Sequence, residues 1–228
     1  MTDNPDPSTG AHTPTPQHPR SSHGKTAHLA DPRADVLSSR FVEALAFAIG
    51  AHGDQPRKGG SVTYVAHLLG VASLVLEAGG DEDMAIAGLL HDTIEDTDTT
   101  AQEIEAEFGS RVAAIVEACT DADVRPKPPW RGRKERYLAH LRAPETPKEV
   151  LVVSRADKLH NARSMLQDYR DVGDGLWSRF KEGPEQQLWY YWTLADTFSE
   201  RLPGPITDEL RRVVEDLSAE VARHPAEG

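Results

Sequence analysis

The sequence has little cysteine, no long apolar run and no N-terminal sorting pattern, and each shortage narrows the class of protein. The lone cysteine among 228 residues is Cys119, which excludes an internal disulfide and a cysteine-rich zinc site. No apolar stretch approaches the roughly 20 residues that a membrane-spanning helix needs. The N-terminus lacks the charged and then apolar pattern of a secretory signal. We therefore predict a cytoplasmic protein without a membrane partner.

Basic residues are also few, with 25 Lys and Arg against 37 Asp and Glu. The formal net charge is -12 at pH 7, whereas a nucleic-acid-binding protein needs a basic face. This argues against nucleic acid as a general partner, but it does not exclude a small phosphorylated ligand in a locally basic pocket. One segment, Arg125 to Arg136, is rich in basic side chains and holds a single acid, Glu135. It either lines such a pocket, mainly through Arg133, Lys134 and Arg136, or is a solvated surface loop.

Apolar side chains recur at helical spacing along most of the chain, and no segment alternates convincingly with the period of two that marks a strand. We therefore predict an all-α fold, with a single helical domain at residues 31–222. Residues 1–30 are rich in Pro, Ser, Thr, Asp and His, so we expect a disordered N-terminal tail. The predicted helices lie near residues 35–50, 63–78, 81–91, 100–108, 110–119, 133–141, 148–169, 177–200 and 206–222.

The apolar helix that precedes His91 and Asp92 is the centre of the functional argument. A buried helix would carry these two ionisable groups into the protein at its C-terminal end. Glu95 and Asp96 follow within one turn, and helical spacing places them over His91 and Asp92. Four polar groups at this point are costly to bury unless a cation joins them. The stretch therefore predicts a metal site, although Glu95 and Asp96 would also suit a simple turn.

Two more side chains complete a candidate ligand set. His67 lies in the second predicted helix, and Asp157 lies in the seventh with Asn161 one turn later on the same face. Taken alone, His67 is more typical of a hydrogen-bonded core histidine, and Asp157 suits an ion-paired helix residue equally well. The four candidate ligands are His67, His91, Asp92 and Asp157. Two imidazoles and two carboxylates disfavour Mg²⁺, Ca²⁺ and a structural zinc site, which leaves one Mn²⁺, Fe²⁺, Co²⁺ or Zn²⁺ ion. Such a site is typical of a metal-assisted hydrolase.

These residues resemble the H…HD…D signature of the HD superfamily of metal-dependent phosphohydrolases. The similarity runs from about Ala44 to Met165 and is strongest to the hydrolase domain of RelA/SpoT proteins and to the small alarmone hydrolases. The segments that carry it are Arg57-Lys58, Tyr64-Val65-Ala66-His67, His91-Asp92-Thr93-Ile94-Glu95-Asp96-Thr97, Thr120-Asp121 and Ala156-Asp157-Lys158-Leu159-His160-Asn161-Ala162-Arg163.

The resemblance implies a Mn²⁺-dependent enzyme that removes pyrophosphate from the ribose 3′ position of (p)ppGpp and gives GDP or GTP. It implies that the four candidate ligands hold the ion and that Glu95 and Asp96 position or deprotonate the attacking water. The candidate substrate-binding residues are Arg57 and Lys58 for the pyrophosphate, Asn161 near the ribose and, from the basic segment, Lys134.

Arg155 stands where the family usually has an apolar residue, and its charge would either enter the pocket or indicate a different substrate. Two alternatives therefore stay open. The chain would be an HD phosphohydrolase of another nucleotide or phosphate ester, or a non-catalytic nucleotide- or metal-binding module. Glu95 and Asp96 argue against the module because holding a metal does not require them. The sequence sets no oligomeric state.

Overall fold

Helices make up the regular structure of residues 37–121 and 128–223, which are the residues that the computed structural model describes. Within these ranges no β-strand forms, and an isolated bridge pairs Pro56 with Thr63. The elements are α1 (Ser39–His52), α2 (Val65–Glu77), α3 (Glu82–Leu90), α4 (Thr93–Asp96), α5 (Ala101–Phe108), α6 (Ser110–Cys119), α7 (Trp130–Arg142), α8 (Lys148–Val172), the 3-10 helix η1 (Gly173–Arg179), α9 (Pro184–Arg201) and α10 (Pro205–Arg223). The all-α prediction is confirmed for these ranges. The predicted disordered tail, residues 1–30, lies outside them, and the bounds 31–222 stay a prediction.

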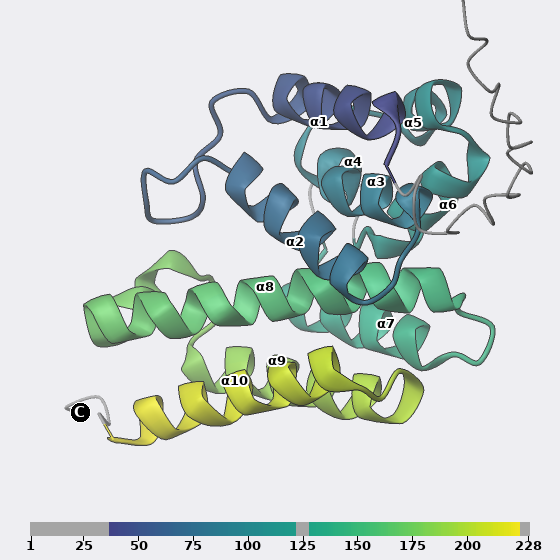
Figure 1. The fold of residues 1–228 in the computed structure, drawn as a ribbon. Coiled ribbons are helices and arrows are strands. Elements are labelled where there is room, and N and C mark those ends of the chain that lie inside the picture. Colours follow the sequence, from purple (N-terminus) through teal and green to yellow (C-terminus); the bar gives the residue numbers. More distant parts are fainter. Residues whose placement is uncertain (1–36, 122–127, 224–228) are drawn as a thin grey trace, which may run out of the picture. The chain divides into compact units, whose positions relative to one another are not determined.

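The longest helix, α8, lies between two groups of helices. Figure 1 shows α2 and α3 on one side of it and α9 and α10 on the other, and α8 contacts all four as well as α6. Because α8 is covered on several sides, its consecutive residues Val150 to Asp157 are all buried. Asp157 therefore lies inside the protein, on a helix whose position is set by apolar packing on both sides.

Helix α3 carries His91 into the same region. Asp81 caps the helix, and its side chain accepts a hydrogen bond from the Met84 amide at 3.1 Å. Every residue from Met84 to Leu90 is buried, so the helix packs on all sides in the core. The last residue of α3 is Leu90, and His91 follows it with only 3% of its surface exposed. The predicted delivery of His91 by an apolar helix is confirmed.

The C-terminal region differs from the prediction of one helix over residues 177–200. The chain instead forms η1 and then starts α9 at Pro184, in the first turn of the helix. The first N–H groups of a helix have no partner within the helix. Proline is favoured there because it has no backbone N–H to leave unpaired. The apolar and aromatic pattern continues across this boundary, so periodicity alone joins two elements that the backbone separates.

Arg155, which departs from the family pattern, does not enter the pocket. The residue is buried, and its Nη1 donates to the Leu202 carbonyl and to Thr207 Oγ1, both at 3.0 Å. The guanidinium thus joins α8 to the turn between α9 and α10. Its charge satisfies backbone and side-chain acceptors in the core, so it gives no indication of a different substrate.

We expect Arg155→Ala to lower the free energy of unfolding by about 2 kcal/mol, because two hydrogen bonds from a buried charged donor are lost. Urea denaturation measures the effect. Arg163→Ala is the matched control, since Arg163 is exposed on the same helix and its ion pair with Glu209 should contribute no more than about 0.5–1 kcal/mol. Equal unfolding midpoints for the two variants would contradict the structural role of Arg155.

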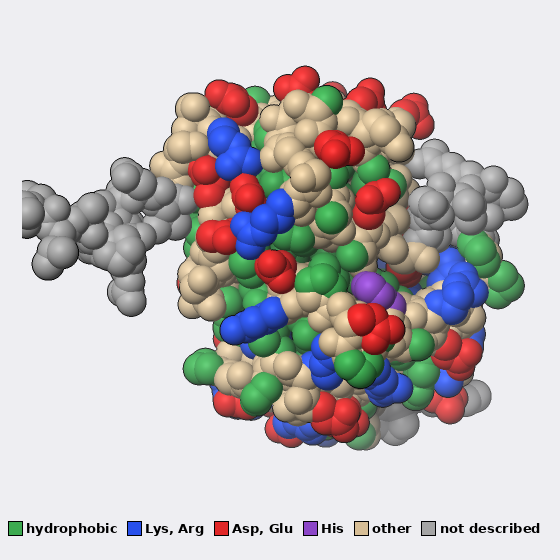
Figure 2. All heavy atoms as spheres, turned by 90° about the vertical axis from the view of Figure 1, so that its right-hand side faces the viewer, with side chains coloured by type: hydrophobic (Ala, Val, Ile, Leu, Met, Phe, Trp, Pro, Cys, Tyr) green, Lys and Arg blue, Asp and Glu red, His purple; other side chains and the backbone are tan. Residues whose placement is uncertain are grey.

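Exposed charges of opposite sign are mixed on the described surface. Arg111 Nη1, for example, lies 2.8 Å from Asp81 Oδ2 and 3.2 Å from Asp83 Oδ2. On the face drawn in Figure 2, Lys and Arg side chains are interspersed with Asp and Glu side chains. That face therefore offers no continuous basic track for a phosphate backbone. None of the described helices is both long and apolar enough to span a membrane.

Candidate metal centre

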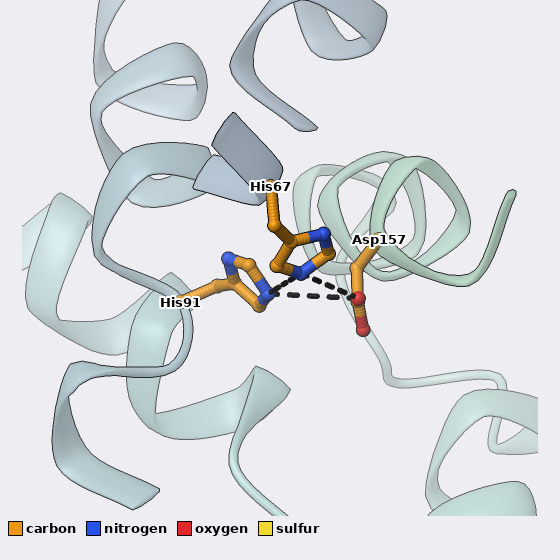
Figure 3. Close-up of side chains that lie close together, drawn as sticks. All are labelled: His67, His91 and Asp157. Carbon is orange, nitrogen blue, oxygen red and sulfur yellow. Dashed lines mark hydrogen bonds and ion pairs between the residues drawn. The ribbon is translucent and has the colours of Figure 1, made fainter. Parts of the chain in front are cut away.

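Two imidazoles and a carboxylate from separate helices meet in the interior. Figure 3 shows His67 of α2, His91 after α3 and Asp157 of α8 directed toward one another. His67 Nε2 lies 3.3 Å from His91 Nε2, and Asp157 Oδ1 lies 3.3 Å and 3.6 Å from these two nitrogens. All three residues are buried, and their ligand atoms lie within 4.8 Å of one another.

Asp92 extends this group on its more exposed side. Its Oδ2 lies 2.9 Å from His91 Nε2 and 3.6 Å from His67 Nε2. The Tyr64 hydroxyl donates to the same oxygen and also lies 3.4 Å from Asp96 Oδ2. The structure therefore brings all four predicted ligands together, with Asp92 next to the two histidines but outside the three-residue group.

The hydrogen bond on the far side of the His91 ring leaves its inner nitrogen available as a ligand. His91 Nδ1 lies 2.9 Å from the Gly88 carbonyl, which can only accept, so Nδ1 carries the proton. In the neutral ring, Nε2 then has a lone pair directed at the centre. A backbone acceptor of this kind is the usual partner of a metal-binding histidine because it fixes both tautomer and ring orientation.

The charges at the centre favour a cation at the point where these atoms converge. Burial raises the pKa of Asp157, but Lys158 and His91 outweigh it and hold the pKa well below its usual range. Burial lowers the pKa of His91, but Asp92 and Asp157 outweigh it and raise the pKa well above its usual value. Metal–ligand bonds of about 2.1 Å place neighbouring ligand atoms about 3 to 3.4 Å apart, which is close to the observed distances of 2.9 to 3.6 Å. The buried His–His–Asp group could therefore hold a metal ion.

Glu95 and Asp96 lie on the short helix α4, immediately after the ligands. The buried Thr93 starts this turn, and its hydroxyl donates to the Leu90 carbonyl at 2.7 Å. Glu95 is half-buried and near Lys134. Burial and the charge of Lys158 lower the pKa of Lys134, while Asp121 and Glu95 act in the opposite direction. The turn thus holds a carboxylate beside the centre on its exposed side.

Two of the predicted substrate-binding residues join the centre through hydrogen bonds. The loop between α1 and α2 carries Arg57, whose Nη2 donates to Asn161 Oδ1 at 3.0 Å. Asn161 Nδ2 in turn donates to Asp157 Oδ1. The second guanidinium nitrogen, Nη1, lies 3.3 Å from His160 Nδ1. Arg57 and Asn161 therefore lie at the centre, and their roles in substrate binding stay predictions.

The two lysines predicted to bind substrate, Lys58 and Lys134, lie farther from the ligands. Lys58 holds its ammonium over the Phe180 ring, 5.7 Å from the centroid. Lys134 forms an ion pair with Asp121, and its Nζ lies 5.0 Å from the Tyr190 ring centroid. Among the described residues, no ion pair or hydrogen bond joins either lysine to the four candidate ligands. Of the basic segment, residues 125–127 lie outside the described part of the chain.

Comparison with known proteins places this arrangement in a family. Residues 44–180 match the model of the HD domain. The chain belongs to the HD domain family. It is 43% identical over 128 residues to guanosine-3′,5′-bis(diphosphate) 3′-pyrophosphohydrolase MESH1 of Xenopus tropicalis, covering 55% of this chain and 69% of that protein. Human MESH1 is 37% identical over 131 residues, covering 56% and 70% of the two chains. A solved structure described as a metazoan ortholog of SpoT that hydrolyzes ppGpp has a TM-score of 0.63 at 23% identity, covering 83% of this chain and 97% of that one.

Three side chains that contact the ligands stand in the segments that carry the resemblance, but sequence reasoning assigned none of these contacts. Tyr64 donates to Asp92, and Lys158 forms an ion pair with Asp157. The Nδ1 atom of His160 lies 3.0 Å from the Nδ1 atom of His67. Helical spacing gives a signal for two of them. Tyr64, which caps α2 in helical conformation, precedes His67 by three residues, and His160 follows Asp157 by three within α8. Each therefore lies on the same side as a ligand.

Proposed function

We propose that this HD domain is a Mn²⁺-dependent (p)ppGpp 3′-pyrophosphohydrolase. The observation that carries the proposal is the convergence of His67, His91, Asp92 and Asp157 next to the turn that holds Glu95 and Asp96. The substrate comes from the relatives, because both MESH1 proteins are named as guanosine-3′,5′-bis(diphosphate) 3′-pyrophosphohydrolases. The solved metazoan structure supports the fold alone, since its identity is 23%.

The four ligands suit the proposed ion. Two imidazoles with two carboxylates form a mixed nitrogen and oxygen set, and the one thiol of the chain, Cys119, lies instead beside Ser154 at 3.5 Å. Mn²⁺ accepts such a set, as Fe²⁺ and Co²⁺ also do. When bound, the ion supplies positive charge to phosphate oxygens and favours ionisation of water. The residues of the chain supply the rest of the chemistry.

Substrate binding would use the cations around the centre. The transition state of phosphoryl transfer spreads negative charge over several oxygens, so fixed positive groups stabilise it. Arg57 already lies at the centre through Asn161, and its planar guanidinium suits two oxygens of the pyrophosphate group. Lys58 and Lys134 would add charge farther along the phosphates, and Asn161 would orient the substrate near the ribose.

Glu95 would act as the general base. Attack of water on the phosphorus that is joined to the 3′ oxygen forms a new P–O bond and breaks the old one. Glu95 accepts a proton from the water, the departing 3′ oxygen takes up a proton from solvent, and pyrophosphate, which carries the oxygen of the water, is released. Asp96, whose carboxylate lies 3.4 Å from the Tyr64 hydroxyl, would help to position the water. These roles explain why two carboxylates stand beside the ligands without belonging to the buried group.

The test is to incubate the Mn²⁺-loaded protein with ppGpp, pppGpp and a panel of ordinary nucleotides. We expect pyrophosphate from the two alarmones, with GDP and GTP as the other products, and no turnover of the panel. Protein treated with a chelator should be inactive, and added Mn²⁺ should restore its activity. Release of orthophosphate, or turnover of ordinary nucleotides, would contradict the alarmone assignment and favour another HD phosphohydrolase. Inactivity toward every compound would favour a binding module.

A further inference from the structure

His160 lies against the outer edge of the His67 ring, on the side away from the proposed ion. The two rings have centroids 4.9 Å apart, and their Nδ1 atoms lie 3.0 Å apart. The opposite nitrogen of His67, Nε2, faces His91, Asp92 and Asp157. The bond at Nδ1 therefore decides whether Nε2 of a neutral His67 carries a proton or a lone pair.

Arg57 settles the direction of that bond. Its Nη1 lies 3.3 Å from His160 Nδ1, and a guanidinium nitrogen can only donate. His160 Nδ1 must therefore be an acceptor without a proton of its own. Since the same atom lies 3.0 Å from His67 Nδ1, the proton between the two histidines belongs to His67. His67 Nε2 then keeps its lone pair for the centre.

Helix α2 makes room for the His160 ring at Gly70, one turn after His67. A Cβ atom at this position would lie 2.2 Å from His160 Cδ2 and 2.3 Å from His160 Nε2. Glycine costs an exposed helix about 0.5 to 1 kcal/mol relative to alanine, so its presence within α2 needs a compensating reason. Close approach of the His160 ring provides that reason.

We propose that His160 is a positioning residue of the metal centre. It accepts the Nδ1 proton of His67 and so directs the Nε2 lone pair of His67 toward the ion, while the gap at Gly70 lets the ring reach its place. The inference rests on the proposed function to the extent that His67 binds the ion. It adds a residue that never touches the metal but sets the tautomer of a ligand from 93 residues away along the chain.

The first test compares two substitutions of nearly equal size. In His160→Asn the amide oxygen takes the place of Nδ1 and can still accept, whereas His160→Leu has no acceptor. Isothermal titration with Mn²⁺ should give a dissociation constant close to wild type for His160→Asn and one that is about 10- to 100-fold weaker for His160→Leu. Circular dichroism of the metal-free variants checks that both are folded.

The second test moves the ring without changing it. Gly70→Ala should weaken Mn²⁺ binding because the new methyl group collides with His160 and displaces its ring. Circular dichroism of the metal-free variant checks that it is folded. Combining Gly70→Ala with His160→Asn should remove most of that loss, since the smaller side chain leaves space for the methyl group. Such coupling between the two positions is absent if each acts only through general stability.

The outcomes separate the inference from the function on which it rests. Wild-type protein that binds no Mn²⁺ would overturn the metal centre itself. Wild-type binding that is unchanged in His160→Leu would leave the centre intact and overturn the role of His160. Equal weakening in His160→Asn and His160→Leu would overturn the acceptor role, because the ring shape rather than its Nδ1 would then matter.

Discussion

Replacing Asp157 with alanine is expected to lower (p)ppGpp hydrolysis by about 10³-fold or more and to remove tight Mn²⁺ binding. Asp157 Oδ1 lies within 3.6 Å of Nε2 of both His67 and His91, so it is the carboxylate that the two buried imidazoles share. Without it, Asp92 is the one anionic ligand left in the set, and the ion loses half of its anionic ligand charge. Isothermal titration with Mn²⁺ and the rate of pyrophosphate release measure the two effects.

The substitution also leaves a buried cation without its partner. Lys158 forms an ion pair with Asp157, and the Lys158 ammonium lies 5.2 Å from the Tyr137 ring centroid. Burial lowers the pKa of Lys158, but Asp157, together with Tyr190 and Tyr137, outweighs this and raises the pKa well above its usual value. Asp157→Ala should therefore destabilise the metal-free protein as well, because a buried charge without its counter-ion is costly.

Thermal unfolding with and without Mn²⁺ separates these two consequences. At about 100 times the dissociation constant, a ligand stabilises the folded state by about 2.7 kcal/mol, so the wild-type midpoint should rise. Asp157→Ala should unfold earlier and show no such rise. Asp168→Ala makes the same change at a partly exposed position of α8, beside Arg179, and should respond to Mn²⁺ like the wild type. A full Mn²⁺ response in Asp157→Ala would exclude Asp157 as a ligand.

Much of the fold follows from local sequence signals. Thr100 and Glu103 form a capping box at the start of α5, with each side chain bonded to the backbone amide of the other. The apolar run before His91 becomes a fully buried helix, as its composition indicates. The prediction was wrong between η1 and α9, where periodicity continues across the boundary although Gly183 and Pro184 mark the start of a new helix.

In the candidate site, too, the sequence indicates some features and tertiary packing decides others. Helix-end placement and the family resemblance point to His91 and Asp92, and the structure brings His67 and Asp157 to them. Contacts such as the one between His160 and His67 depend on how α2 packs against α8, which no single-helix pattern encodes. The direction of Arg155 is set in the same way by the turn after α9. Tertiary packing therefore decides the partners of the ligands, while the sequence indicates the ligands themselves.

Replacing Glu95 with glutamine is expected to lower turnover by about 10² to 10⁴-fold while Mn²⁺ binding is retained. The amide has nearly the same shape as the carboxylate but cannot accept a proton from the attacking water. The four ligands are untouched, so the Mn²⁺-dependent rise of the unfolding midpoint should equal that of the wild type. Single-turnover measurement of pyrophosphate release from ppGpp, at saturating Mn²⁺, isolates the chemical step from product release.

Two further variants decide how a loss of turnover in Glu95→Gln is interpreted. Glu107→Gln makes the same change on the exposed side of α5 and should leave turnover unchanged, which excludes a general effect of lost negative charge. Asp96→Asn tests the neighbouring carboxylate, which the Tyr64 hydroxyl approaches at 3.4 Å. Because an amide oxygen can still orient water, Asp96→Asn should cost less than Glu95→Gln. The opposite order would transfer the role of general base to Asp96, and full activity in both variants would remove a protein base from the mechanism.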